Sequence, residues 1–195
     1  MAETTPALRA VVEESGLVVH EHPLMVLDPT TSVSTVAGTD EDVSVRIMDL
    51  DDPALPSALA VPHLAFAEPG TGIGLAGAAE LAEAVREHGG DVDHVAARIR
   101  AGLTVVSAAV KDGTALCAGQ HQPIGTVSEV VGVGTLPAAR RRGFGLAVTA
   151  ALVTDARSRG VETVFLSAGD EDVAGIYARL GFRRIATALI AEPAE

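Results

Sequence analysis

An arginine-rich turn punctuated by glycine constrains the fold of this chain more than any other stretch. Residues 140–145 read Arg-Arg-Arg-Gly-Phe-Gly, after an apolar run at 130–136 and before an alanine-rich segment at 146–159. A strand that leads through such a turn into a helix directs the unpaired amides of the helix start toward a ligand. Glycine lets a ligand approach the backbone, and arginine adds fixed positive charge. In a chain with a net charge of −12, three adjacent arginines therefore indicate an anion site.

The composition predicts one globular domain with at most a small N-terminal subdomain. Of the 195 residues 48% are hydrophobic and only 3% aromatic, so the core must consist mainly of aliphatic side chains. The single cysteine, Cys117, excludes an internal disulfide and a cysteine zinc cluster, and its apolar neighbours favour a buried thiol. Because no apolar run is as long as a membrane span and no signal peptide is visible, we expect a cytoplasmic protein.

The acidic balance of the chain bears on its partners. Contacts with phosphates of nucleic acid require a basic surface, so the excess of acidic residues argues against nucleic-acid binding. The same charge is compatible with a cationic amine substrate.

The pattern of apolar residues and turns predicts an α+β fold in two parts. Residues 1–42 are expected to be an N-terminal extension and linker, and residues 43–195 the main domain, because 28–42 is rich in Thr, Ser, Asp, Gly and Pro. Pro23 is expected to separate two short strands. The expected helices span 6–15, 54–66, 75–88, 92–101, 143–159 and 171–180, and the expected strands span 17–20, 24–27, 43–47, 103–110, 114–120, 126–133, 161–168 and 182–190.

Two motifs follow one another in the second half of the chain. Residues 137–145 fit P-x-x-R-x-x-G-x-G, and residues 170–182 read Asp-Glu-Asp-Val-Ala-Gly-Ile-Tyr-Ala-Arg-Leu-Gly-Phe. They resemble the acetyl-CoA signature Q/R-x-x-G-x-G/A and the later motif N-x-x-A-x-x-L-Y, followed by G-F, of the GNAT superfamily (the Gcn5-related N-acetyltransferases). The resemblance covers roughly 103–190. It implies a GNAT-like fold, with a mixed twisted sheet of about six to seven strands flanked by helices and an N-terminal helix-strand extension.

The resemblance also implies that acetyl-CoA binds at the arginine turn as a co-substrate, without a metal. Backbone amides of 141–145 would hold the pyrophosphate, and the arginine side chains would address the pyrophosphate and the 3′-phosphate. Thr135 stands where the family usually has valine, and Asp170 where it has asparagine; Asp170 would contact the cofactor or cap the following helix. The implied cofactor-binding residues are Val131, Val133, Thr135, Arg140, Arg141, Arg142, Gly143, Phe144, Gly145 and Asp170.

Two catalytic residues are implied by the same resemblance. Tyr177 matches the family tyrosine that protonates the departing CoA thiolate, although its place in an apolar helical stripe would by itself make it a core residue. Glu129 lies in the middle of a strand and is either the general base, directly or through water, or part of a solvated strand face. His121 is a second candidate for the base. A backbone amide near Val133 would stabilise the oxyanion.

These expectations favour an acetyl-CoA-dependent N-acetyltransferase that moves an acetyl group to a primary amine of a small molecule or peptide by direct attack. The alternative is a GNAT-fold module that binds acyl-CoA and regulates or scaffolds without turnover, because Thr135 and Asp170 depart from the motifs. The acceptor pocket is expected in 54–103. On the habit of the family we expect a homodimer and no membrane partner.

Three further patterns have weaker support. Residues 72–77 match G-x-G-x-x-G, but no strand is expected before them, so we interpret them as a loop near the acceptor rather than a dinucleotide site. His20 and His22 share a strand face without a third metal ligand. The aspartates within 49–52 lack the spacing of a calcium loop and are expected in a solvated turn.

Overall fold

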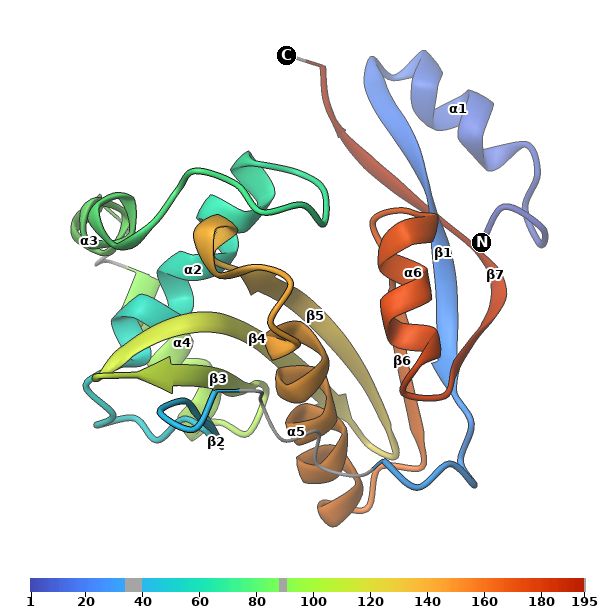
Figure 1. Ribbon diagram of the computed structural model, residues 1–195. Coiled ribbons are helices and arrows are strands. Elements are labelled where there is room, and N and C mark those ends of the chain that lie inside the picture. The colour runs from blue at the N-terminus through green and yellow to red at the C-terminus, as the bar shows by residue number, and fades with distance from the viewer. Residues whose placement is uncertain (34–39, 88–90, 195) are drawn as a thin grey trace. The chain divides into compact units, whose positions relative to one another are not determined.

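The computed structural model describes residues 1–33, 40–87 and 91–194 (Figure 1). The chain forms two compact units. The larger contains 32–164, and the smaller combines 1–31 with the C-terminal segment that starts at Phe165. The compact units divide the chain after residues 31 and 164. They do not test the boundary expected after residue 42, which stays a prediction.

The larger unit contains a four-stranded antiparallel sheet with four α-helices and a short 3-10 turn. Its strand order is β2-β3-β4-β5. The strands are β2 (Ser44–Ile47), β3 (Val105–Lys111), β4 (Thr114–Ile124) and β5 (Val127–Thr135); the helices are α2 (Leu55–Ala67), α3 (Ala78–Glu87), α4 (Asp91–Arg100) and α5 (Phe144–Ser158), and the 3-10 turn η1 is Pro137–Ala139.

Helices α2 and α5 cover opposite faces of this sheet. A Cβ atom on Gly134 would lie 2.8 Å from Cβ of Ala65 and 2.9 Å from Cα of Pro62, so α2 packs directly on the β5 backbone. The next residue, Thr135, faces α5, because a Cβ on Gly145 would lie 3.7 Å from its Oγ1. Successive strand residues point to opposite faces. Both sides of β3 are accordingly buried from Val105 to Val110.

A β-bulge interrupts β5 just before the arginine turn. Gly134 lies opposite Ala118 on β4 and Val131 lies opposite Gln120, so β5 holds one more residue than β4 over this interval. Gly132 takes up the bulge with a φ of +62°, a left-handed value that side chains disfavour. The extra residue of a bulge has no partner on the facing strand, so this part of β5 has backbone groups that β4 does not use.

The smaller unit is a three-stranded antiparallel arrangement with two helices, to which β6 contributes from Phe165 onward. Strand β1 (Leu17–Leu27) lies between β6 (Thr163–Ser167) and β7 (Phe182–Pro193), and α1 (Leu8–Glu14) and α6 (Glu171–Ala178) complete the unit. The N-terminal segment thus adds a strand between two C-terminal strands.

The prediction that Pro23 divides two short strands is wrong. Strand β1 runs through Pro23, which lies opposite Thr187 of β7. The carbonyl of Pro23 accepts a hydrogen bond from Ala168 at 2.9 Å, and pairing with β6 begins only at Leu24. Pro23 thus keeps its acceptor bond to Ala168 and lies just outside the paired register of β6, a position at the end of a ladder that tolerates proline.

The predicted α+β, GNAT-like fold class is confirmed, with seven strands against the expected six to seven. The six expected helices are present, with bounds that differ from the expected ones by at most three residues. Among the described residues, every helix is too short or too polar to cross a membrane.

Candidate active site

The arginine turn connects η1 to the start of α5 and contains two left-handed residues. Arg141 has a φ of +67° and Gly143, the N-cap of α5, has a φ of +81°. A turn that visits left-handed conformations directs successive amides toward a common point and forms a concave anion site. No heavy atom lies within 4 Å of the position that a Cβ on Gly143 would take, so the concavity is open there.

Several backbone amides of this turn have no acceptor among the described residues. In the described part of the chain, the amides of Arg141, Gly143, Phe144, Gly145 and Leu146 donate to neither backbone nor side chain. They lie at the positive end of α5, a helix of 15 residues. This arrangement favours a phosphate or a similar anion.

Arg140 holds the turn in place and is buried, with only 8% of its surface exposed. Its guanidinium donates to the carbonyl of Ala65 at 3.0 Å, to that of Gly72 at 3.2 Å and to that of Glu68. Two of these carbonyls lie at the C-terminal end of α2, where helical carbonyls have no intrahelical partner. The guanidinium thus has three acceptors within the protein, and the predicted contact of this side chain with the cofactor stays a prediction.

The other two arginines have different surroundings. Arg142 forms an ion pair with Asp40 and lies over the ring of Phe144, with 4.9 Å between the guanidinium carbon and the ring centroid. Arg141 is exposed, and its side chain has no partner among the described residues. Of the three, Arg141 is therefore the side chain most available to a phosphate.

The G-x-G-x-x-G segment is attached to the arginine turn. It follows helix α2 rather than a strand, so it lacks the preceding strand that a dinucleotide motif requires. The amide of Gly74 donates to the carbonyl of Pro137, and the amide of Ala138 donates to that of Ala76, both at 3.0 Å. The carboxylate of Glu68 accepts from the amides of this segment. The segment thus supports the arginine turn.

Glu129 lies half-buried on β5, opposite Gln122 of β4. Burial raises the pKa of its carboxyl group above the usual value, because the charged form loses solvation. No hydrogen-bond partner compensates for this among the described residues. A carboxylate with a raised pKa accepts protons more readily near neutral pH, which suits a general base.

His121, the second candidate for the base, is part of a buried network. Its ring is fully buried, with Nδ1 2.9 Å from the hydroxyl of Ser128 and Nε2 2.9 Å from a carboxylate oxygen of Asp155. Asp155 also pairs with Arg159. Because Asp155 can only accept, Nε2 carries the proton and Nδ1 accepts from Ser128. Both ring nitrogens are thus used, so His121 is less suited than Glu129 to receive a proton from a substrate.

The His121 network leads to a prediction about stability. Burial lowers the pKa of His121 below its ordinary value of 6.5. As the pH falls below 6.5, the unfolded chain therefore takes up this proton before the folded protein does, and stability is lost. We expect the free energy of unfolding of the wild type to fall over this range more steeply than that of His121→Gln, measured by urea denaturation at several pH values. If the free energy of unfolding depended on pH equally in the two proteins, the lowered pKa of His121 would be contradicted.

Thr135 and Cys117 face each other across β4 and β5. The hydroxyl of Thr135 donates to the sulfur of Cys117 at 3.3 Å. Cys117 is fully buried, and burial raises the pKa of its thiol to about 12, so it is not a nucleophile. The proton of the Thr135 hydroxyl is thus used within the protein.

Asp170 and Tyr177 belong to the smaller unit. The carboxylate of Asp170 accepts from the amide of Val173 at 2.7 Å, so its capping role is confirmed. Tyr177 is largely buried on α6, and its ring meets that of Phe182 edge to face, with centroids 6.0 Å apart. Tyr177 thus packs in the core, as its apolar stripe predicts. The predicted role of its hydroxyl as the acid for the CoA thiolate stays a prediction.

His20 and His22 have ring centroids 6.5 Å apart, and His20 pairs with Glu192. The described residues contain no group of three or more His, Cys, Asp or Glu side chains that could hold a metal ion. Asp52 of the predicted solvated turn pairs with Arg46 through two hydrogen bonds of 2.9 and 3.0 Å.

Comparisons with known proteins agree with this fold. Residues 106–190 match the family model for FR47-like protein. A GCN5-related N-acetyltransferase from Kribbella flavida is 22% identical with a TM-score of 0.64; the match covers 97% of this chain and 65% of that one. A GCN5-related N-acetyltransferase from Sphaerobacter thermophilus is 19% identical with a TM-score of 0.60, and the match covers 96% of this chain and 55% of that one. A GCN5-related N-acetyltransferase-like protein from Streptococcus suis is 14% identical with a TM-score of 0.61, and the match covers 94% of this chain and 66% of that one. No curated protein matches the sequence.

At these identities the likeness to the solved structures shows a GNAT-type fold, and this chain spans less than two thirds of the length of each of the three proteins. The FR47-like segment includes both motifs that resemble the GNAT acetyltransferases, and the fold of the chain is similar to the fold of GNAT proteins. The predicted family resemblance is confirmed.

Sequence reasoning missed several features of the turn. It treated the three arginines as equivalent, although Arg140 is buried against backbone carbonyls and Arg142 pairs with Asp40. Motif spacing does not distinguish them, because their partners lie far away in the sequence. The buried bond between His121 and Asp155 likewise joins residues 34 positions apart.

Proposed function

We propose that this chain binds acetyl-CoA at the arginine turn and transfers its acetyl group to a primary amine. The observation that supports this most strongly is the set of amides of Arg141, Gly143, Phe144, Gly145 and Leu146, which have no acceptor among the described residues and lie at the start of α5, beside the exposed side chain of Arg141. A pyrophosphate requires such a set of converging donors.

The proposed cofactor contacts use backbone more than side chains. The amides of 141–145 hold the pyrophosphate, and Arg141 reaches the 3′-phosphate. The β5 backbone at Val131, Val133 and Thr135 pairs with the pantetheine arm, and the bulge at Gly132 supports this because it leaves groups that β4 does not use. The amide near Val133 stabilises the oxyanion.

The proposed reaction is direct attack of the amine on the thioester. The amine nitrogen forms a bond to the carbonyl carbon as the bond from that carbon to sulfur breaks. Glu129 accepts the proton from the amine, directly or through water, and its raised pKa supports this role. Following the family resemblance, Tyr177 donates a proton to the thiolate that leaves. The products are the N-acetylated amine and free CoA.

Replacement of Glu129 tests the base. Glu129→Gln keeps the shape of the side chain but cannot accept the proton, so kcat is expected to fall by about 100-fold. The wild-type rate should rise with pH through the raised pKa of Glu129, and this rise should be absent from the variant. A pH profile of kcat for both proteins checks this. An unchanged profile would mean that Glu129 is only part of a strand face.

Replacement of Tyr177 tests the acid. Tyr177→Phe keeps the ring packed against Phe182 and removes the hydroxyl. We expect kcat to fall by about 100-fold while the affinity for acetyl-CoA changes less than about twofold. If turnover were unchanged, Tyr177 would be a core residue alone.

The experiment that tests the function is release of free CoA from acetyl-CoA in the presence of a pool of primary amines, followed with a thiol reagent. We expect release that depends on the amine. Binding of acetyl-CoA without release would instead support the non-catalytic acyl-CoA-binding module.

A further inference from the structure

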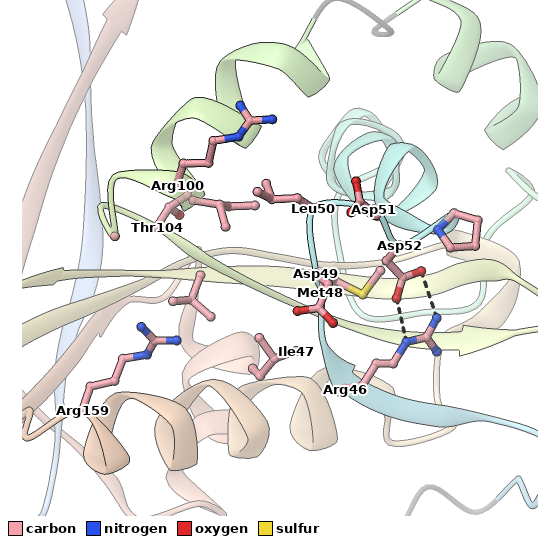
Figure 2. Close-up of a pocket in the computed structure, with 14 residues that line it drawn as sticks. Arg46, Ile47, Met48, Asp49, Leu50, Asp51, Asp52, Arg100, Thr104 and Arg159 are labelled. Carbon is pink, nitrogen blue, oxygen red and sulfur yellow. Dashed lines mark hydrogen bonds and ion pairs between the residues drawn. The ribbon is translucent and has the colours of Figure 1, made fainter.

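The larger unit has a cavity of about 710 Å³ that the proposed acetyl transfer does not use. It is lined by the end of β2 and the turn that follows, by the end of α4 and the start of β3, and by Arg159 (Figure 2). Its volume lies within the range of pockets that bind small molecules.

Two helices separate this cavity from the arginine turn. Helix α2 begins at the cavity, where Asp52 accepts from the amide of Ala54, and its last carbonyls are held by Arg140. Helix α5 runs the other way, from Gly143 at the turn to Arg159 just after its end. Helices of 13 and 15 residues are about 20 Å long, so the cavity and the turn are separate sites.

The cavity carries charges of both signs that no described residue neutralises. Arg46 and Asp52 satisfy each other through two hydrogen bonds, which lower the pKa of Asp52. In contrast, the side chains of Asp49, Asp51 and Arg100 are exposed and have no hydrogen-bond or ion-pair partner among the described residues.

Arg159 adds a second cation to the lining. It pairs with Asp155, yet 47% of its side chain is exposed. In Figure 2 Arg100 and Asp51 lie toward the top of the view and Arg159 toward the bottom, so the cations belong to different parts of the lining.

Apolar groups lie between these charges. The lining includes Ile47, Leu50, Ile99 and Val105, and Figure 2 shows Leu50 between Thr104 and Asp51. The hydroxyl of Thr104 is already bonded to Gln120 at 3.0 Å. A ligand therefore meets an apolar surface with charged groups around it.

From this arrangement we propose that the cavity binds a small zwitterion with an apolar side chain, namely a free amino acid or a dipeptide. The carboxylate pairs with Arg100 or Arg159, and the ammonium group pairs with Asp49 or Asp51. The apolar side chain packs against Leu50 and its aliphatic neighbours. A purely anionic ligand would face the two aspartates and a purely cationic one the arginines, and like charges in contact are unfavourable.

The test uses chemical controls that remove one charge at a time. L-Leucine and glycyl-L-leucine are titrated into the full chain by calorimetry, beside N-acetyl-L-leucine, which lacks the ammonium group, and L-leucinamide, which lacks the carboxylate. We expect dissociation constants of about 0.01–1 mM for the first two and affinities lower by about tenfold for the controls. Amide chemical shifts in NMR spectra should change at 46–53 and 99–105.

Variants locate the site. Arg100→Gln and Asp49→Asn/Asp51→Asn are expected to weaken binding of glycyl-L-leucine by about tenfold. Arg86→Gln and Asp93→Asn are the controls, since they remove an exposed positive charge from α3 and an exposed negative charge from α4. Both should leave the binding of glycyl-L-leucine unchanged. Gly143→Glu should also leave it unchanged, so the result is independent of the acetyl-CoA site.

The proposal fails if neither zwitterion binds at 10 mM (about tenfold above the weakest expected constant). It also fails if the N-acetyl and amide controls bind equally well, or if shift changes occur at 141–146 instead. Binding that the Arg100 and Asp49/Asp51 variants weaken, and that Arg86→Gln does not, supports it.

Discussion

Gly143→Glu is expected to lower the affinity for acetyl-CoA by about 100-fold or more. Gly143 has a left-handed φ of +81° and caps the helix whose unpaired amides form the proposed phosphate site. A glutamate there would place a negative charge beside the pyrophosphate, and like charges in contact cost several kcal/mol. Calorimetric titration of acetyl-CoA into wild type and variant measures the effect.

Gly160→Glu is the matched control. Gly160 has a φ of +83°, and a Cβ on it would also meet nothing within 4 Å, so the backbone strain of the substitution is closely similar. It follows the opposite end of α5, away from the turn. This variant should bind acetyl-CoA as the wild type does. Equal losses in both variants would mean that strain, rather than charge at the turn, weakens binding.

Arg140→Ala is expected to lower the free energy of unfolding by about 2–4 kcal/mol. Arg140 is buried, and three backbone carbonyls accept from its guanidinium, two of them near the end of α2. Hydrogen bonds to a charged group stabilise by about 1.5–3 kcal/mol, and carbonyls left without a donor in a buried position add a further penalty. Urea denaturation at constant pH measures the loss.

Arg141→Gln distinguishes a role in cofactor binding, proposed for Arg141, from the role in stability of Arg140. The side chain of Arg141 is exposed, so we expect the free energy of unfolding to change by no more than about 0.5 kcal/mol and the affinity for acetyl-CoA to fall about tenfold. Acetyl-dephospho-CoA, which lacks the 3′-phosphate, should bind wild type and variant equally. A large loss of stability in Arg141→Gln, with none in Arg140→Ala, would reverse our assignment.

The fold could be predicted largely because its signals are local. The Gly143 turn, the cap at Asp170 and the alternation in 43–47 each depend on a few adjacent residues. The Pro23 prediction failed for the opposite reason. Whether a proline interrupts a strand depends on which neighbour its nitrogen faces, and β6 and β7 come about 140 and 160 residues later.

The site was predictable as a motif but not as a set of contacts. Residues 140–145 indicate an anion site from charge and glycine alone. The three arginines differ in their contacts, because Arg140 bonds to carbonyls at the end of α2 and Arg142 pairs with Asp40. A local sequence pattern does not reveal these distant partners. The raised pKa of Glu129 likewise depends on burial, which comes from the packed sheet.

The proposed function requires that acetyl-CoA binds to this protein. Titration of acetyl-CoA into the purified protein by calorimetry, with NAD and ATP as controls, measures it directly. We expect a dissociation constant in the micromolar range for acetyl-CoA, and binding at least about tenfold weaker for the two nucleotides. No binding of acetyl-CoA, or equal binding of all three, would contradict the assignment of the arginine turn as a CoA site.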